Sequence, residues 1–334
     1  MAPPLALTLG DPAGIGPEIA LKRWLARKDG DPAFFLLADP DATSRAARAL
    51  GFDAPLARVA PEEAAGAFAR ALPVVPLGVA YEGAPGRPSR ADAAATVESI
   101  RRAVALVREG RAGAIVTNPI AKKPLYEAGF PHPGHTEYLG ALATELWGAP
   151  ARPVMMLWSE TLAVALATVH IPLAEVARSV TREGVVAVGR IVARDLVARF
   201  GIARPRIAVA GLNPHAGEGG TIGREDLETV APAVADLRAE GIDARGPLPA
   251  DTMFHAKARA GYDAALAMYH DQGLVALKTL AFDQGVNVTL GLPFVRTSPD
   301  HGTAFDIAGR GIADDSSLAA ALRLAARLAR ATAP

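Results

Sequence analysis

The sequence predicts an α/β fold in which largely parallel sheets are covered by helices. Short apolar runs alternate with longer stretches of helical period along most of the chain, and no low-complexity linker separates them. The short runs are rich in Val, Ile, Leu and Ala, which is typical of strands buried on both faces. With 334 residues, the chain is long enough for two such domains or one large one.

The elements follow in order along the chain. We expect strands over residues 5–9, 34–38, 114–117, 163–169, 207–212 and 264–269. We expect helices over residues 17–27, 93–109, 182–200, 224–240 and 317–331. Gly201 and Gly241 are suited to end two of these helices, because glycine readily adopts the left-handed conformation that follows a helix. Residues 53–90, which are rich in Ala, Pro and Gly, are the least periodic, and we expect irregular or antiparallel structure there.

Composition narrows the function classes. Lys plus Arg equals Asp plus Glu, 35 each, so no net field favours nucleic acid or an anionic membrane as a partner. No apolar stretch approaches the length of a membrane-spanning helix. The first residues lack the basic segment of a signal peptide and reach Gly10-Asp11-Pro12 early. Cysteine is absent, which fits a cytoplasmic enzyme and excludes thiolate metal ligands. We therefore expect small-molecule chemistry in the cytoplasm.

Three histidines each follow a short apolar run: His170, His215 and His270. In open α/β sheets, ligands gather at the carboxyl ends of the strands. Imidazole is also a common ligand of zinc and similar divalent ions. A single histidine after a strand is more often a hydrogen-bonded loop residue, but the threefold repetition favours a metal site built from distant parts of the chain.

Two further segments carry polar groups suited to anions. The loop Gly10–Glu18 has the spacing Gly-x-x-x-Gly-x-Gly, so it is at least as consistent with a tight strand-to-helix turn as with a phosphate cradle. The segments 117–123 and 134–138 bring two lysines, a histidine and hydroxyl groups within about twenty residues. Lysine pairs on loops are usually solvated, so these segments alone decide nothing.

The C-terminal third is denser in polar side chains. Asp251 and Asp271 can ligate a metal, orient a histidine or accept a proton, and each is as well suited to capping a helix. Lys278 and Asn287 occur between apolar runs in the same region. Arg296 can grip a carboxylate or a phosphate through two parallel hydrogen bonds.

The glycine-spaced loop 300–311 resembles the adenosine-binding loop of the isocitrate and isopropylmalate dehydrogenases. Those enzymes bind NAD or NADP without the usual Rossmann fingerprint, which is absent here as well. The resemblance implies that His301 and Gly302 lie near adenine and that Asp306 lies near the ribose hydroxyls. An acid at that position would repel a 2′-phosphate, so we expect NAD rather than NADP.

Seven motifs, spread over most of the chain, resemble the 4-hydroxythreonine-4-phosphate dehydrogenase family of pyridoxal phosphate biosynthesis. They occur in the order in which that family has them. The motifs are Gly10–Glu18, Gly134–Glu137, Gly211–Gly220, Gly246–Thr252, Ala267–Gly273, Gly285–Phe294 and Arg296–Ala304.

The resemblance implies a fold, an assembly and a set of site residues. The fold is that of the isocitrate and isopropylmalate dehydrogenases: two α/β/α domains, with the active-site cleft between the domains and at the interface of a homodimer. Residues 1–125 and 275–334 would form the cofactor-binding domain, and residues 126–274 the domain for dimerisation, metal and substrate. One Zn, Mg or Co ion would be held by His170, His215 and His270, which need not all come from one chain. The implied contacts of the phosphorylated substrate are His135, Thr136, Lys278, Asn287 and Arg296.

The implied reaction is the NAD(P)-dependent oxidation of 4-hydroxythreonine 4-phosphate at C3, followed by decarboxylation to 3-amino-2-oxopropyl phosphate. Lys278 and a water held by Asp251 are the candidates for the catalytic base, and Asp271 is a third candidate catalytic residue. A sister group acts on erythronate or threonate 4-phosphate and has a histidine where this chain has Leu274, so Leu274 favours the vitamin B6 branch. The residues are also compatible with a three-histidine hydrolase of a phosphorylated small molecule, and with a ligand-binding protein without catalysis.

Overall fold

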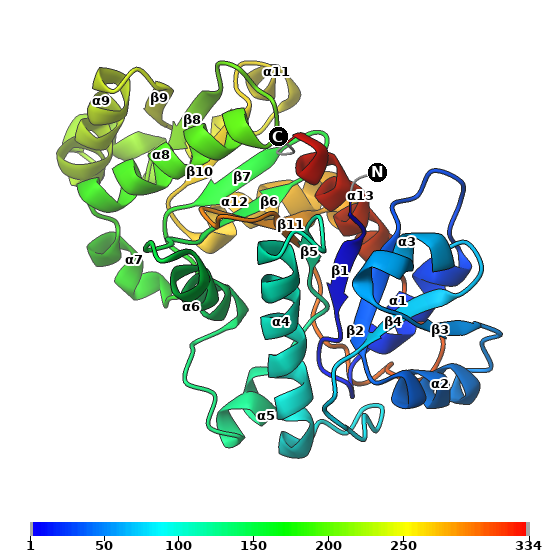
Figure 1. The fold of residues 1–334 in the computed structure, drawn as a ribbon. Helices are drawn as coiled ribbons and strands as arrows, with labels where there is room; N and C mark the ends of the chain where they lie inside the picture. Colours follow the sequence, from blue (N-terminus) through cyan, green and yellow to red (C-terminus); the bar gives the residue numbers. More distant parts are fainter. Residues whose placement is uncertain (1–2, 332–334) are drawn as a thin grey trace. The chain divides into compact units, whose positions relative to one another are not determined.

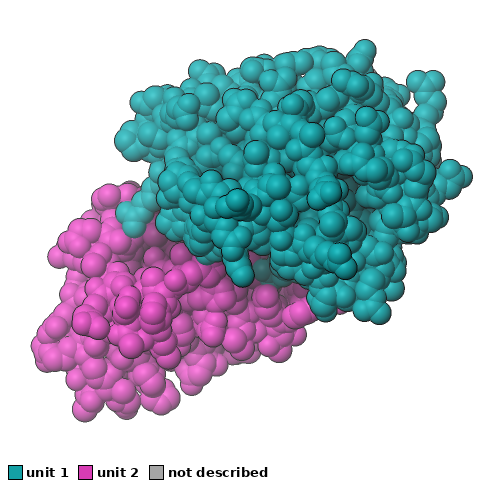
Figure 2. Space-filling view, turned by 90° about the horizontal axis from the view of Figure 1, so that it is seen from below, with its two compact units in different colours: residues 1–153, 292–333 teal, residues 154–291, 334 magenta. Residues whose placement is uncertain are grey.

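The computed structural model describes residues 3–331 (Figure 1) and divides into two compact units. Unit 1 comprises Met1–Pro153 with Leu292–Ala333, and unit 2 is essentially Val154–Gly291, coloured teal and magenta in Figure 2. Unit 1 is therefore discontinuous in the chain, but both breaks lie later than the expected ones at residues 125 and 274. As a consequence, His135 belongs to unit 1 and Lys278 to unit 2.

Unit 1 contains strands that all run parallel, in the spatial order β3-β4-β2-β1-β5-β12. The strands are β1 (Leu5–Thr8), β2 (Phe34–Ala38), β3 (Leu56–Arg58), β4 (Leu72–Pro76), β5 (Ile115–Val116) and β12 (Arg296–Pro299). The α-helices are α1 (Gly16–Leu25), α2 (Pro40–Ala49), α3 (Ala64–Ala67), α4 (Ala93–Arg108), α5 (Lys122–Glu127), α6 (His135–Trp147) and α13 (Ser316–Ala331). The short helices η1 (Pro61–Glu63) and η2 (Arg90–Asp92) complete it.

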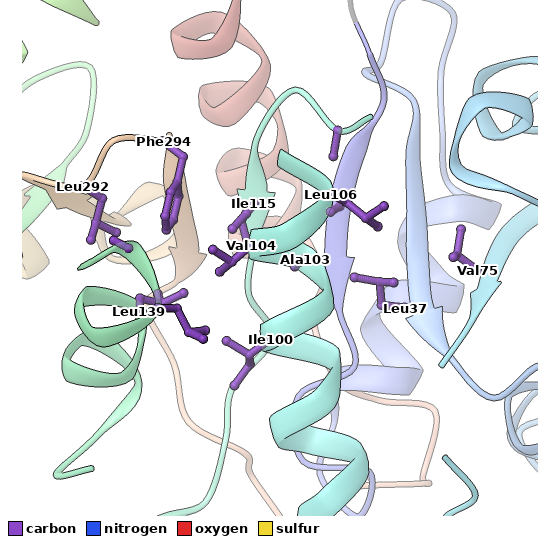
Figure 3. Close-up of a cluster of buried hydrophobic side chains, with 14 of the residues drawn as sticks. Leu37, Val75, Ile100, Ala103, Val104, Leu106, Ile115, Leu139, Leu292 and Phe294 are labelled. Atoms are coloured by element: carbon purple, nitrogen blue, oxygen red, sulfur yellow. The ribbon is translucent and has the colours of Figure 1, made fainter. Parts of the chain in front are cut away.

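The core of unit 1 forms between its strands and helix α4. Ile100, Val104 and Leu106 point from α4 toward β1, β2 and β5, as Figure 3 shows. Leu139 of α6 and Phe294 close the same cluster. Helix α13 contacts β12, β1 and β5 from behind α4 in this view, so the strands are covered on both faces. This double coverage explains why their sequences are continuous apolar runs.

Residues 53–90 differ from the expectation. They contain β3 and β4, which pair in parallel with each other, and β4 also pairs in parallel with β2, so the expected antiparallel structure is wrong. The strand signal is weak because β3 has only three residues and β4 includes two prolines, Pro73 and Pro76. The prediction of a low-regularity segment holds for most of residues 77–89, which form neither helix nor strand.

The strands of unit 2 lie in the spatial order β11-β6-β7-β10-β8-β9 (Figure 1). Strand β6 runs antiparallel to its neighbours β11 and β7, whereas β7, β10, β8 and β9 run parallel to one another. The strands are β6 (Val154–Trp158), β7 (Ala163–Leu166), β8 (Arg206–Ala210), β9 (Asp243–Leu248), β10 (Ala264–Ala267) and β11 (Val286–Leu290). The α-helices are α7 (Leu173–Ser179), α8 (Arg182–Ala198), α9 (Ala231–Ala239), α10 (Ala250–Met253), α11 (Ala256–Arg259) and α12 (His270–Ala281). Short helical segments are η3 (Pro214–Gly220), η4 (Asp226–Val230) and η5 (Phe282–Gln284).

The α/β class with largely parallel strands is thus confirmed. The expected helix over 224–240 is present as two pieces, because a π-helical turn, η4, precedes α9. Gly201 and Gly241 follow α8 and α9 with φ values of 70° and 83°, as expected of residues that end helices. Among residues 3–331, no helix has the length and apolar character needed to cross a membrane.

Candidate active site

The three histidines predicted to bind metal follow three neighbouring strands of unit 2. His170 comes after β7, His270 after β10, and His215 after β8. These strands lie in the order β7-β10-β8 and run parallel. Their carboxyl ends therefore meet at one edge, the position where ligands bind in such sheets. Adjacent strands are about 4.8 Å apart, so the ends of the two outer strands, β7 and β8, are separated by about 10 Å across the sheet.

His170 and His270 are brought together. The centroids of their imidazole rings lie 5.4 Å apart, with an interplanar angle of 44°. His270 is the first residue of α12, and its Nδ1 lies 2.7 Å from Oδ1 of Asp271. Because Nδ1 is engaged by this carboxylate, Nε2 is the nitrogen of His270 that is available to a cation.

His215 lies in an unusual turn. It begins five consecutive residues in the left-handed region, with φ values of 53°, 52°, 75°, 41° and 67°, of which only two are glycines. Asp226 stabilises the entry to this turn: its buried carboxylate accepts hydrogen bonds from the backbone N–H of Leu212 at 2.6 Å and of Asn213 at 2.9 Å. Strained backbone of this kind is concentrated at functional sites.

In the described part of the chain, no three His, Asp or Glu side chains are arranged to hold a metal ion. The structure thus pairs His170 with His270 and does not bring His215 into contact with them.

The strand ends that carry these histidines are joined by hydrogen bonds. The side chain of Gln272 accepts from the backbone N–H of Met268 and donates to the carbonyl of Gly211, both at 2.7 Å. Thr168 donates from Oγ1 to the carbonyl of Met268 at 2.7 Å. Consecutive bonds therefore link the ends of β7, β10 and β8.

Unit 1 contains a buried cation at the first residue of β12. Arg296 is 3% exposed, and its Nε and Nη2 donate to Oγ1 of Thr117, at the end of the neighbouring β5, at 3.1 and 2.6 Å. Burial lowers the pKa of Arg296 to about 10, so the guanidinium stays charged at neutral pH.

His135 and Thr136 form the N-terminus of the thirteen-residue helix α6. His135 is partly exposed, but its Nε2 is buried and has no hydrogen-bond partner among the described residues. Burial, and to a smaller extent the charge of Arg296, hold the pKa of His135 well below its usual value. A neutral imidazole, a helix N-terminus and a guanidinium together are suited to an anion.

The remaining predicted substrate and catalytic residues lie in unit 2. Asn287 is on β11, and its Oδ1 is buried with no partner among the described residues. Lys278 lies in the last turn of α12, with Nζ 5.8 Å from the centroid of the Phe282 ring. Asp251 is exposed in the first turn of α10, a helix that contacts the segment carrying His215. The five predicted substrate contacts therefore divide between the units.

The predicted cofactor residues lie on an irregular loop of unit 1. Nδ1 of His301 is 3.1 Å from the carbonyl of Gly302, and its Nε2 is buried without a partner in the described structure. Asp306 is exposed. The loop turns at Ala304, which has a φ of 43°.

Three polar residues that organise these groups are not identified by the sequence patterns: Glu18, Asp226 and Gln272. All three act through hydrogen bonds to backbone groups far away in the sequence. Glu18 and Gln272 lie within the motifs Gly10–Glu18 and Ala267–Gly273, and Asp226 begins η4, but no local pattern indicates the backbone groups that they bind.

Comparison with known proteins decides the family. The family model of the pyridoxal phosphate biosynthetic protein PdxA matches residues 31–325. The chain belongs to this family. A 4-hydroxythreonine-4-phosphate dehydrogenase of Methylorubrum populi is 61% identical over 330 residues, covering 98% of this chain and 95% of the relative. One of Xanthobacter autotrophicus is 59% identical, covering 99% of this chain and 95% of the relative.

A solved structure gives the same relationship. The crystal structure of 4-hydroxythreonine-4-phosphate dehydrogenase from Klebsiella pneumoniae superposes with a TM-score of 0.87 at 39% identity, covering 98% of this chain and 99% of that one. The resemblance seen in the seven motifs is therefore confirmed for nearly the whole length of the PdxA-family chain.

Proposed function

We propose that this PdxA-family protein oxidises 4-hydroxythreonine 4-phosphate at C3 and promotes its decarboxylation to 3-amino-2-oxopropyl phosphate, in pyridoxal phosphate biosynthesis. The observation that carries the proposal is 61% identity over 98% of the chain to a relative of that name. A dehydrogenase of this family suggests a nicotinamide cofactor and a divalent metal. The two groups of polar side chains described above are chemically suited to a metal ion and to a phosphate.

The proposed metal site uses the imidazoles at the strand ends. His170 and His270 fit a divalent cation, because their rings are near neighbours and Asp271 engages the other nitrogen of His270. His215 is the proposed third ligand, from the same subunit or from the second subunit of a homodimer. When bound, such an ion polarises an alcohol or carbonyl oxygen. Zn, Mg and Co are the candidates, since imidazoles and oxygens accept all three.

The proposed phosphate site is the group of His135, Thr136 and Arg296 in unit 1. The neutral His135 can donate a hydrogen bond from its unpartnered Nε2, and the backbone at the start of α6 offers further N–H groups. Arg296 supplies the positive charge. Lys278 and Asn287 are proposed as further contacts of the same substrate.

The proposed base takes the proton of the C3 hydroxyl group. Lys278 and a water held by Asp251 are the first candidates, because Asp271 is already bonded to His270 and is better placed to orient it. The proposed cofactor is NAD, with NADP as the alternative, held by His301, Gly302 and Asp306. We propose that the protein is a homodimer in the cytoplasm.

The test is a direct assay of the purified protein with a divalent metal, NAD or NADP, and 4-hydroxythreonine 4-phosphate. We expect formation of the reduced nicotinamide together with one CO₂ per turnover. The matched substrates are erythronate 4-phosphate and threonate 4-phosphate, which have the phosphate but not the amino group. A higher kcat/KM for either of them would overturn the proposed substrate. Release of inorganic phosphate without nicotinamide reduction would instead favour hydrolysis.

A further inference from the structure

The carboxylate of Glu18 is buried in unit 1 against the loop that carries the predicted cofactor residues. Its side chain is 2% exposed. Oε2 accepts a hydrogen bond from the backbone N–H of Gly309 at 3.1 Å, and Oε1 accepts one from Ala313 at 2.8 Å. A single side chain therefore holds two points of the loop that are four residues apart.

Neighbouring residues on the same face of α1 contact the same loop. The backbone N–H of Ile15 donates to the carbonyl of Thr303 at 3.0 Å, and Nζ of Lys22 donates to the carbonyl of Ala313 at 2.6 Å. Glu18 and Lys22 are four residues apart, so their side chains lie along one side of the helix, and Ile15 is the residue that immediately precedes it. Contact with the loop thus extends along two turns of α1.

Gly14 allows this close approach. A Cβ atom at Gly14 would lie 3.0 Å from the carbonyl oxygen of Thr303 and 3.1 Å from its Cβ. A side chain at this position would therefore require Thr303 to move by a few tenths of an ångström. The glycine-rich turn that follows β1 therefore serves loop packing, in addition to the chain reversal expected from its sequence.

A favourable interaction with the helix dipole does not account for Glu18. Such an acid is stabilising while exposed to solvent, and it needs no partner. Burial of a carboxylate costs free energy unless hydrogen bonds or an opposite charge compensate it. Here both hydrogen-bond donors are backbone groups of the loop, and Nζ of Lys22, which itself bonds to the loop, lies 4.0 Å from Oε1. The local geometry of Glu18 is therefore explained by the loop and not by the helix alone.

We propose that Glu18 is a positioning residue that holds residues 300–313 in the shape that receives the adenosine part of the nicotinamide cofactor. His301, Gly302 and Asp306 all lie on this segment, between its start and the two amides that Glu18 binds. This inference rests on the proposed function, because it takes these residues as the cofactor contacts. Glu18 itself is not expected to touch the cofactor or the substrate.

The test is Glu18→Gln, which keeps the shape but places an amide NH₂ against a backbone N–H. We expect the dissociation constant of NAD, measured by calorimetry, to rise about tenfold. Hydrogen exchange at the amides of Gly309 and Ala313 should accelerate, and metal affinity should stay unchanged. The KM for NAD should rise while that for the phosphorylated substrate does not. The matched control is Glu183→Gln, since Glu183 lies exposed in the first turn of α8.

A second variant, Gly14→Ala, introduces the close contact with Thr303 without a change of charge. It tests the positioning of the loop if Glu18→Gln does not fold. We expect the same selective loss of NAD affinity. NAD affinity equal to that of the parent protein, or an equal loss of NAD and metal affinity, would overturn the positioning role. If the parent protein itself binds no NAD or NADP, the proposed function fails, and that result is separate from any effect of the variants.

Discussion

Gln272 and Gly211 are 61 residues apart in the sequence and are joined by a hydrogen bond: Nε2 of Gln272 donates to the carbonyl of Gly211 at 2.7 Å. The same amide accepts from Met268 through its oxygen. Both donor and acceptor of the side chain are therefore used by backbone at the ends of β8 and β10. These are the strands that precede His215 and His270, so the spacing of the two predicted ligands depends on this amide.

Replacement of Gln272 by Met keeps the size of the side chain and removes both hydrogen bonds. We expect metal affinity to fall by about tenfold, since groups around metal ligands typically contribute tenfold to a hundredfold. The measurement is titration of the metal-free protein with Co²⁺, followed by its visible spectrum. Gln284→Met, at an exposed glutamine of the same unit, is the control. Unchanged Co²⁺ affinity and spectrum would contradict this expectation.

Asp271→Asn separates two roles for this carboxylate. If Asp271 orients His270, the variant binds metal at least tenfold more weakly, because the amide stabilises the imidazole less well than a carboxylate does. If Asp271 is the catalytic base, metal affinity stays the same and only kcat falls. The structure favours the first result, and calorimetric metal titration beside steady-state kinetics distinguishes the two.

Arg296→Lys keeps the positive charge but loses the two-pronged donation to Thr117. We expect the KM for the phosphorylated substrate to rise roughly tenfold, with a smaller effect on kcat, if the arginine binds the phosphate equally in ground and transition states. Inhibition by inorganic phosphate should weaken in parallel. A loss confined to kcat would place Arg296 at the reacting carbon instead.

The depressed pKa of His135 predicts a pH dependence of stability. The folded protein keeps this imidazole neutral, whereas the unfolded chain protonates it near pH 6.5, so the unfolded state binds more protons below that pH. The free energy of unfolding should therefore decrease as the pH falls from 7 to 5, and His135→Asn should reduce this decrease. Urea unfolding of both proteins at the two pH values measures the difference. Equal slopes would show that His135 titrates normally.

Gly273→Ala tests the packing of helix α12 on β7. A Cβ at Gly273 would lie 2.5 Å from Cγ1 of Val164, so either this side chain or the helix that begins with His270 must shift. We expect a destabilisation of about 1–3 kcal/mol, as for other overpacked cores. Gly66→Ala is the matched control, because no atom lies within 4 Å of the added Cβ, and the helix α3 should be unchanged or slightly stabilised. Thermal unfolding compares the two variants.

Much of the fold is predictable because its strands are buried on both faces. The run Phe34–Ala38 matches β2 at both ends, and the helix expected over 93–109 is α4 within one residue. The strands before the three histidines are shorter than expected, since the chain leaves the sheet at Leu166, Ala210 and Ala267. Apolar composition alone does not distinguish the end of a strand from the apolar residues of the loop after it.

The candidate site is less predictable, because its organisation depends on contacts between distant parts of the chain. Residue types identify the histidines and Arg296, but the link from Gln272 to Gly211 has no local pattern. Leu274 illustrates the opposite case. Its identity favours one substrate over another, and the structure buries it in the hydrophobic core of unit 2. A residue near the start of a helix can thus contribute to core packing even when its neighbours in the sequence are candidate site residues.

The discontinuity of unit 1 has a consequence for synthesis on the ribosome. Strand β12 and helix α13 are the last parts of this unit to be made, and they contact β5 and β1, which are among the first. While residues 154–291 emerge, the apolar side of β1 and β5 lacks the helix that covers it. Unit 2 is continuous in the chain and can fold in that interval. Chaperones should therefore bind nascent chains mainly at their N-terminal half.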